Sequence, residues 1–233
     1  MSLLDVRNLA GGYPGTRVLD GVDLTVEEGG VLVLLGRNGV GKTTLVHTVM
    51  GMLPGSGSIR FEGEELLGRA THAIARSGLA LVPQGRRVFA PLTVDENLRI
   101  AAHRARAGRW TPQEVYRLFP RLEERRRTWA GQLSGGEQEM LSIGRALVTN
   151  PRLLVMDEPS DGLAPSIISL VGDVVESLAS EGVTVLLVEQ NLALALRVAD
   201  DVAVMSKGRV TFTGRPDDLR HDAARVRDLL GVG

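Results

Sequence analysis

The segment Gly36–Thr43, with the sequence Gly-Arg-Asn-Gly-Val-Gly-Lys-Thr, constrains the fold of this chain more than any other feature. It follows the apolar run Val31–Leu35, which is typical of a strand buried on both faces. A helical stretch, Leu45–Met50, comes next and is expected to stop at Gly51 and Pro54. A strand, a glycine-rich turn and a helix in this order are the context that the pattern G-x-x-x-x-G-K-[ST] requires. An ordinary glycine turn is the alternative, and this context weakens it.

Each residue type in this segment suits a phosphate group. Glycines let backbone N–H groups curve around the β- and γ-phosphates, and the following helix points its positive end at the same anion. Lys42 supplies a compact charge and Thr43 a hydroxyl for Mg²⁺. Among 27 basic residues only Lys42 and Lys207 are lysines, so a lysine here indicates a specific need. The residues expected to bind nucleotide are Gly36, Arg37, Asn38, Gly39, Val40, Gly41, Lys42, Thr43 and Thr44.

Composition limits the other classes of function. The formal net charge of the 233 residues is −1, so the chain lacks the basic field that nucleic-acid binding requires. It has no cysteine, which excludes disulfides and thiolate metal sites. The longest apolar runs are strand-sized, far below the ~20 residues of a membrane helix, and the N-terminus lacks the layout of a signal peptide. We expect a soluble, cytoplasmic protein with one main core and no nucleic-acid partner.

The rest of the chain alternates between strand and helix patterns. Strands are expected at Leu3–Val6, Val18–Val26, Ser58–Phe61, Leu79–Val82, Leu153–Met156, Val183–Val188, Val202–Met205 and Arg209–Phe212. The pattern between Val94 and Thr149 is helical and rich in arginine, with a helical insertion at Arg99–Thr128. A terminal helix is expected at Asp217–Leu230. This alternation predicts an α/β fold with a parallel sheet.

Two adjacent carboxylates, Asp157 and Glu158, end the apolar run Leu153–Met156. Adjacent acids at the end of a buried strand are costly unless a cation uses them. We expect Asp157 to hold Mg²⁺, directly or through water, and Glu158 to accept a proton from the attacking water. The alternative is a solvated strand end before Pro159, and the phosphate loop makes it less attractive.

The segment Leu133–Gln138, Leu-Ser-Gly-Gly-Glu-Gln, begins another helix. Ser134 and Glu137 have the spacing of a capping box, and apolar positions with helical periodicity follow. Gly135 and Gly136, however, occupy the first turn, where glycine costs helix stability. Glycines there suit close approach of the backbone to an anion. Because the first helix already holds one nucleotide, this second helix start is better placed to contact a nucleotide on another subunit.

Together with the phosphate loop and the acid pair, this segment makes the chain resemble the ATP-binding subunits of ABC transporters over essentially its whole length. Leu133–Gln138 resembles the signature motif of that family. The resemblance implies a P-loop NTPase (RecA-like) core with a mainly parallel sheet, an N-terminal antiparallel β subdomain and an inserted α-helical signature subdomain. It implies one ABC ATP-binding domain over 1–233, with the helical subdomain at 87–150 and the remainder at 1–86 and 151–233. The residues implied to contact the partner's nucleotide are Ser134, Gly135, Gly136, Glu137 and Gln138.

The resemblance also implies ATP and Mg²⁺ as cofactors and adds residues to the site. Tyr13, with Val18, matches the aromatic platform for adenine, where stacking favours an aromatic side chain. Gln84 matches a glutamine that reaches Mg²⁺ and senses the membrane subunits. The implied metal ligands are therefore Thr43, Gln84 and Asp157.

Two positions depart from the family pattern. Gln190 stands where most members have a histidine that contacts the γ-phosphate, and an amide can donate a hydrogen bond but carries no charge. Asp161–Ala164 matches a loop that lies across the dimer interface, yet Ala164 replaces its usual acid. The resemblance still predicts an ATP hydrolase with Glu158 and Gln190 as catalytic residues, and the two departures leave its rate open.

Three segments resemble one branch of the family, the second ATP-binding subunit of branched-chain (hydrophobic) amino acid importers. Their sequences are VPQGRRVFAPLTVDENL, DEPSDGLAPSII and LLVEQN. Gln84 and Pro165–Ile168 resemble subunits of urea and short-chain amide importers at least as well, so that alternative stays open. The implied partners are integral-membrane permease subunits, a second, paralogous ATP-binding subunit and, indirectly, a periplasmic or lipid-anchored substrate-binding protein. The chain would lie peripherally on the cytoplasmic face of the membrane, with a groove near Val88–Leu92 that receives a permease helix.

A non-transport ABC ATPase of DNA repair or translation is the rival class. Such proteins usually carry coiled-coil insertions, zinc hooks or two tandem nucleotide domains, whereas this chain has one phosphate loop, one signature and no heptad run. Only the cluster Arg121–Arg127 favours that class, and its interleaved acids are typical of a solvated helix face. A scaffold that binds nucleotide without hydrolysing it is opposed by Glu158.

Overall fold

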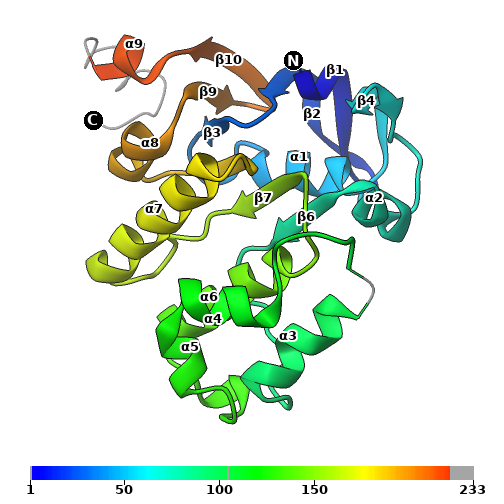
Figure 1. The fold of residues 1–233 in the computed structure, drawn as a ribbon. Coiled ribbons are helices and arrows are strands. Elements are labelled where there is room, and N and C mark those ends of the chain that lie inside the picture. Colours follow the sequence, from blue (N-terminus) through cyan, green and yellow to red (C-terminus); the bar gives the residue numbers. More distant parts are fainter. Residues whose placement is uncertain (1, 104, 221–233) are drawn as a thin grey trace.

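The computed structural model describes residues 2–103 and 105–220, which form two sheets and the helices around them (Figure 1). The larger sheet has six strands in the order β10-β9-β3-β8-β7-β6. All of its neighbouring strands are parallel except β10, which runs antiparallel to β9. The smaller sheet is antiparallel and has the order β2-β1-β4-β5. The predicted mainly parallel core with an N-terminal antiparallel sheet is therefore confirmed.

The antiparallel sheet is built from β1 (Ser2–Tyr13), β2 (Thr16–Glu27), β4 (Gly55–Phe61) and β5 (Glu64–Glu65). The expectation of short strands at its start was wrong, because β1 and β2 are each 12 residues long and pair as one hairpin. Their register shifts repeatedly, for example between Val6 and Leu9. Each such irregularity interrupts the alternation of polar and apolar residues, so the sequence pattern shows only fragments of each strand.

The parallel core is built from β3 (Val31–Leu35), β6 (Leu79–Val82), β7 (Leu153–Asp157), β8 (Thr184–Glu189), β9 (Asp201–Ser206) and the edge strand β10 (Arg209–Gly214). Every residue of β3 is buried because both faces of the sheet are covered. Val33 and Leu35 face one hydrophobic cluster, and Leu32 and Leu34 face the other. This packing explains the unbroken apolar run before the glycine loop.

The sheets are flanked by α1 (Lys42–Val49), α2 (Thr71–Ser77), α7 (Pro165–Ser180), α8 (Leu192–Val198) and α9 (Pro216–Arg220). Helix α1 starts at Lys42, earlier than the expected Leu45, because the glycine loop leads directly into its first turn. Most of the terminal helix expected at Asp217–Leu230 lies outside the described residues.

Helices α3 (Val94–Ala102), α4 (Pro112–Leu118), α5 (Pro120–Glu124) and α6 (Gly135–Leu147), with the short turn η1 (Ala130–Gln132), lie between β6 and β7 and gather below the sheet (Figure 1). Helix α3 begins at Val94, where the helical pattern was expected to start, and Thr93 and Glu96 form a capping box there. The capping box expected at Ser134 and Glu137 is present at the start of α6. The division into subdomains at 87–150 stays a prediction.

Candidate nucleotide-binding site

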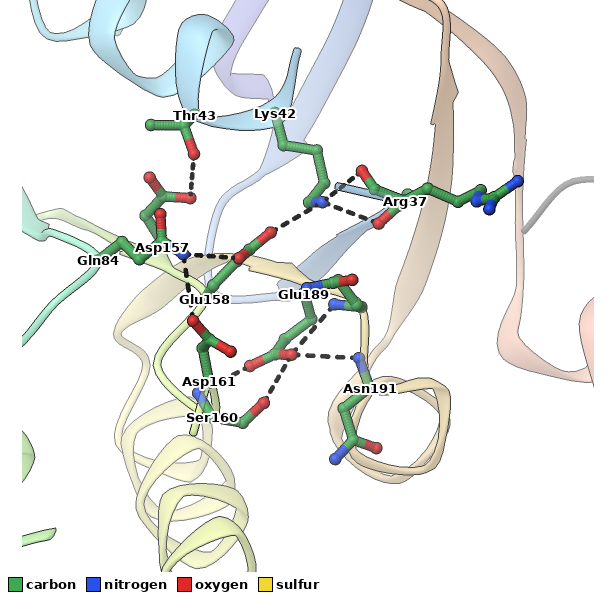
Figure 2. A network of polar contacts seen from close by, with 12 residues as sticks. Arg37, Lys42, Thr43, Gln84, Asp157, Glu158, Ser160, Asp161, Glu189 and Asn191 are labelled. Carbon is green, nitrogen blue, oxygen red and sulfur yellow. Dashed lines mark hydrogen bonds and ion pairs between the residues drawn. The ribbon is translucent and has the colours of Figure 1, made fainter. Parts of the chain in front are cut away.

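Lys42 lies in the first turn of α1, and its side chain is 3% exposed. Its Nζ donates to the carbonyl oxygens of Gly36 at 2.8 Å and Arg37 at 2.9 Å, and it pairs with Oε1 of Glu158 at 2.8 Å (Figure 2). These three acceptors match the three N–H donors of an ammonium group. The guanidinium of Arg37 points away from this network in Figure 2, so Arg37 contributes its backbone. The ammonium group of Lys42 is thus held at the border of the glycine loop by three contacts.

The glycines of the loop are required by its backbone. Gly39 and Gly41 have φ angles of 79° and 112°, a region that residues with a Cβ rarely adopt. A Cβ on Gly36 would lie 2.7 Å from the carbonyl oxygen of Met205. Gly41 is also the N-cap of α1, and no described side chain caps this helix. The first N–H groups of α1 are therefore available to an anion.

Asp157, the last residue of β7, accepts a hydrogen bond of 3.3 Å from the hydroxyl of Thr43 in α1. Burial raises the pKa of Asp157 to about 6, opposed by this hydrogen bond and by Lys42. A hydroxyl beside a carboxylate offers the oxygen ligands that Mg²⁺ prefers. In residues 2–103 and 105–220, no group of three or more His, Cys, Asp or Glu side chains could hold a metal. The oxygens of Thr43 and Asp157 fit Mg²⁺ bound jointly with nucleotide phosphates, which is the usual mode for this ion.

Glu158 contacts both Lys42 and Gln84. It is 7% exposed, and besides Lys42 it accepts a 3.0 Å hydrogen bond from Nε2 of Gln84. The same Nε2 donates to Asp161 at 3.3 Å, so Gln84 bridges Glu158 and the following turn (Figure 2). Glu158 also has a φ of 50°, a strained conformation for a residue other than glycine.

Glu189, the last residue of β8, was not predicted from the sequence. It is 1% exposed and accepts hydrogen bonds from Ser160 N and Oγ and from the backbone N–H groups of Gln190 and Asn191. Burial raises the pKa of Glu189, although these four hydrogen bonds favour its carboxylate form. The residue fastens the turn after Glu158 to the end of the neighbouring strand (Figure 2). A buried acid that ends an apolar run, as Asp157 does, was the available signal.

The structure brings ten of the twenty predicted site residues to one pocket of about 410 Å³. Tyr13, 47% exposed, is one of its lining residues, as expected of a ring that stacks on a ligand. Every lining residue belongs to the set predicted from the sequence: Tyr13, Val18, Asn38, Gly39, Gly41, Lys42, Thr43, Thr44, Gln84 and Glu158.

Ten predicted residues do not line this pocket. Gly36, Arg37, Val40 and Asp157 lie within two positions of lining residues, whereas Gln190 and Ser134–Gln138 lie farther along the chain. Gln190 follows β8 and is exposed. Ser134–Gln138 begin α6, where Ser134 and Glu137 cap the helix and the side chain of Gln138 donates to the carbonyl oxygen of Ala130 at 3.1 Å. The start of α6 is therefore built as a helix cap, separate from the nucleotide pocket of its own chain.

A parallel sheet with a glycine loop and a helix start at its carboxyl edge defines a P-loop nucleotide-binding protein. Comparison with known families shows which family of P-loop proteins this is. The model of the ABC transporter family matches residues 19–161, and the chain belongs to this family. The prediction of an ABC transporter ATP-binding subunit is confirmed.

Similar proteins cover nearly all of the chain. BraG of Pseudomonas aeruginosa, a high-affinity branched-chain amino acid transport ATP-binding protein, is 48% identical over 86% of this chain and 87% of its own. BraF of the same organism, with the same description, is 33% identical over 98% of each chain. LptB of Escherichia coli, a lipopolysaccharide export system ATP-binding protein, is 33% identical over 99% and 98%.

A solved nucleotide-free ATP-binding cassette from an ABC transporter superimposes with a TM-score of 0.86 at 27% identity, covering 100% of both chains. This likeness agrees with the predicted fold. Within the part of the chain that the structure describes, no helix combines the length and apolar character needed to cross a bilayer.

Proposed function

We propose that this chain binds and hydrolyses ATP to drive an ABC importer, with Lys42, Thr43, Asp157 and Glu158 as its chemical centre. The observation that carries the proposal is the buried contact between Lys42 and Glu158 at 2.8 Å, inside the pocket that the glycine loop borders. In this scheme the loop N–H groups and Lys42 bind the phosphates, and Tyr13 with Val18 carries the adenine. Bound Mg²⁺, held by Thr43 and Asp157 with Gln84 nearby, would neutralise charge on the phosphates.

The ion pair suggests how ATP switches on its own hydrolysis. While Glu158 is paired with Lys42 and Gln84, its oxygens are occupied and it is poorly placed to take a proton. An arriving γ-phosphate competes with Glu158 for Lys42, since both are anions that the ammonium can bind. Release of Glu158 leaves a carboxylate beside the phosphate that can accept a proton from the attacking water.

The same scheme assigns Ser134–Gln138 to the nucleotide of a second chain. Support comes from their separation from the pocket and from the two glycines in the first turn of α6. BraG and BraF are two ATP-binding proteins of one organism that share a description, which favours a paralogous second subunit. Gln190 would donate its amide to the γ-phosphate once the turn after β8 moves toward the pocket.

The proposed substrate is a branched-chain amino acid, on the strength of the 48% identity with BraG. Urea and short-chain amides remain the second candidates because Gln84 and Pro165–Ile168 resemble their importers. The test is uptake of radiolabelled leucine and urea by cells that carry the complete transporter, with and without Glu158→Gln. Leucine uptake that depends on Glu158 is expected. Uptake of urea alone would assign the chain to the second group, and export of a lipid would remove it from the importers.

The proposed permease contact is a groove of about 770 Å³ that is lined in part by Pro83 and Arg87, the near sequence neighbours of Gln84, and by Phe89, which is 44% exposed. Asn97, fully buried, accepts from the Phe89 N–H at 2.9 Å and donates to its carbonyl oxygen at 3.1 Å, so the backbone that presents the ring is fixed. The guanidinium of Arg145 stacks 4.1 Å from the ring centre. The lining includes Arg76, Arg87, Arg106 and Arg145 and no acid, which fits a short apolar segment that carries an acidic side chain.

Crosslinking tests this contact and the peripheral position at the cytoplasmic face of the membrane. The chain has no native cysteine, so Phe89→Cys supplies a single thiol in the groove. Ile100→Cys, at a site 54% exposed on α3, is the matched control. Capture of a permease segment by Phe89→Cys alone is expected. Exclusive capture of nucleic acid or ribosomal protein would instead support the non-transport class.

A further inference from the structure

Arg86 links two segments that the proposed function assigns to different nucleotides. Its Nη2 donates to the carbonyl oxygens of Asp161 at 3.1 Å and Gly162 at 3.0 Å, in the turn after Glu158. Its Nη1 lies against the first turn of α6, since a Cβ on Gly135 would be 2.5 Å from that atom. The guanidinium of Arg86 thus contacts both the turn after Glu158 and helix α6, which we call the signature helix.

The same face of α6 carries an acid without a hydrogen-bond partner. Glu139 follows Gly135 by four residues, a spacing that places both on one side of a helix. It is 3% exposed, and its Oε1 accepts no hydrogen bond from any described residue. Two charges act on it: Arg86 from the segment after β6, which favours its ionised form, and Glu189 from the end of β8, which opposes it. Burial raises the pKa of Glu139 to about 7.

We propose that Arg86 is a positioning residue that exchanges partners when two ATP-loaded chains close: it leaves the carbonyls of Asp161 and Gly162 and pairs with Glu139. The distance is short, because residues four apart on a helix are separated by about one turn, roughly 5.4 Å. Arg86 has a φ of 53°, a strained conformation that its present contacts maintain and that a shift can relieve. The exchange rests on the proposed function, and it makes the turn after Glu158 responsive to the position of the signature helix.

A double-mutant cycle tests the exchange. Arg86→Gln and Glu139→Gln are compared singly and together in the assembled ATPase, with kcat and KM for ATP measured separately. Each single variant is expected to lower kcat about tenfold, the value of one charge-assisted hydrogen bond, with KM unchanged. The double variant should be no slower than either single variant, because the two changes remove the same contact. Additive losses, or no loss of kcat, would overturn the proposal.

Three further measurements separate this role from a structural one. In the nucleotide-free chain at about pH 5, below the pKa of Glu139, the effects of the two variants on unfolding free energy should add, since no hydrogen bond joins the two side chains and the protonated acid carries no charge for Arg86 to act on. Arg86→Lys should recover part of kcat because it keeps the charge. The wild-type kcat should rise as the pH passes through about 7 and Glu139 ionises, and Glu139→Gln should lack this rise. A wild-type chain whose ATPase activity is insensitive to Glu158→Gln would refute the proposed function itself, whereas a sensitive enzyme with additive Arg86 and Glu139 effects refutes only the exchange.

Discussion

The starts of α1 and α6, the two helices that the proposed function assigns to nucleotide phosphates, are built in opposite ways. At α1 no described side chain caps the helix, and the buried charge of Lys42 has three partners. At α6 Ser134 and Glu137 cap each other, and the nearby buried acid Glu139 has an unpartnered oxygen. The first arrangement is ready for a ligand of its own chain. The second lies away from that ligand and is suited to a partner that arrives only on assembly.

Glu158→Gln should have the largest effect on the α1 side of this comparison. The variant keeps the shape of the side chain but cannot accept a proton, so we expect kcat to fall about a thousandfold while ATP still binds. Steady-state hydrolysis and equilibrium ATP binding are the two measurements. Glu62→Gln is the matched control, because Glu62 is an exposed glutamate with a similar φ of 51°. Wild-type turnover in Glu158→Gln would remove Glu158 as the general base.

Lys42→Ala should have the second-largest effect, which is a loss of ATP affinity. It removes the cation for the phosphates and leaves Glu158 without its ion-pair partner, a change expected to weaken ATP binding by about 10²- to 10³-fold. Calorimetric titration with ATP measures this loss. Lys207→Ala, which changes the other lysine of the chain at an exposed turn, should leave the affinity unchanged. Equal losses in both variants would mean that the effect is not local.

On the α6 side, Glu139 makes stability depend on pH. Its pKa is about 7 in the folded chain, above the ordinary value of 4.5, so the folded state holds this proton more tightly than the unfolded state does. Its contribution is complete below pH 4.5 and is lost as the pH rises through about 7. The loss should amount to about 3 kcal/mol, because the pKa rises from 4.5 to about 7 on folding and each pKa unit corresponds to about 1.4 kcal/mol.

Urea unfolding of the nucleotide-free chain from pH 5 to pH 8, roughly the window in which this linkage operates, checks this prediction. Glu139→Gln should be more stable than the wild type at the upper end and show a smaller decline across the range. Parallel curves for the two proteins would show that Glu139 is already ionised at the lower end.

Gln190→Ala should have a smaller effect on turnover than Glu158→Gln. It removes one hydrogen bond to a charged phosphate, for which a slowing of about tenfold is expected. Gln190→His should be tolerated because an imidazole can also donate to phosphate. Single-turnover hydrolysis by the three proteins is the measurement. Unchanged turnover in Gln190→Ala would leave this residue outside the site, in agreement with a pocket lining that does not include it.

The sequence predicted the features that depend on residues close together in the chain. The strand, loop and helix around Lys42 are one example, and the capping box that begins with Ser134 is another. The contacts of Arg86 and Glu189 were missed because they depend on the order of strands in the sheet and on turns far apart in the chain. The length of β1 was missed because its bulges hide the alternating pattern.

The central claim is that one chain binds ATP but needs the signature helix of a second chain to hydrolyse it. Specific ATPase activity, measured across a wide range of protein concentrations, tests this most directly for the chain alone and with the proposed second ATP-binding subunit. Ser134→Asn is the matched variant, since asparagine caps a helix as serine does but lacks the hydroxyl. We predict that specific activity rises with concentration and that Ser134→Asn lowers it while ATP affinity stays the same. Constant specific activity down to dilutions at which light scattering finds only monomers would contradict the claim.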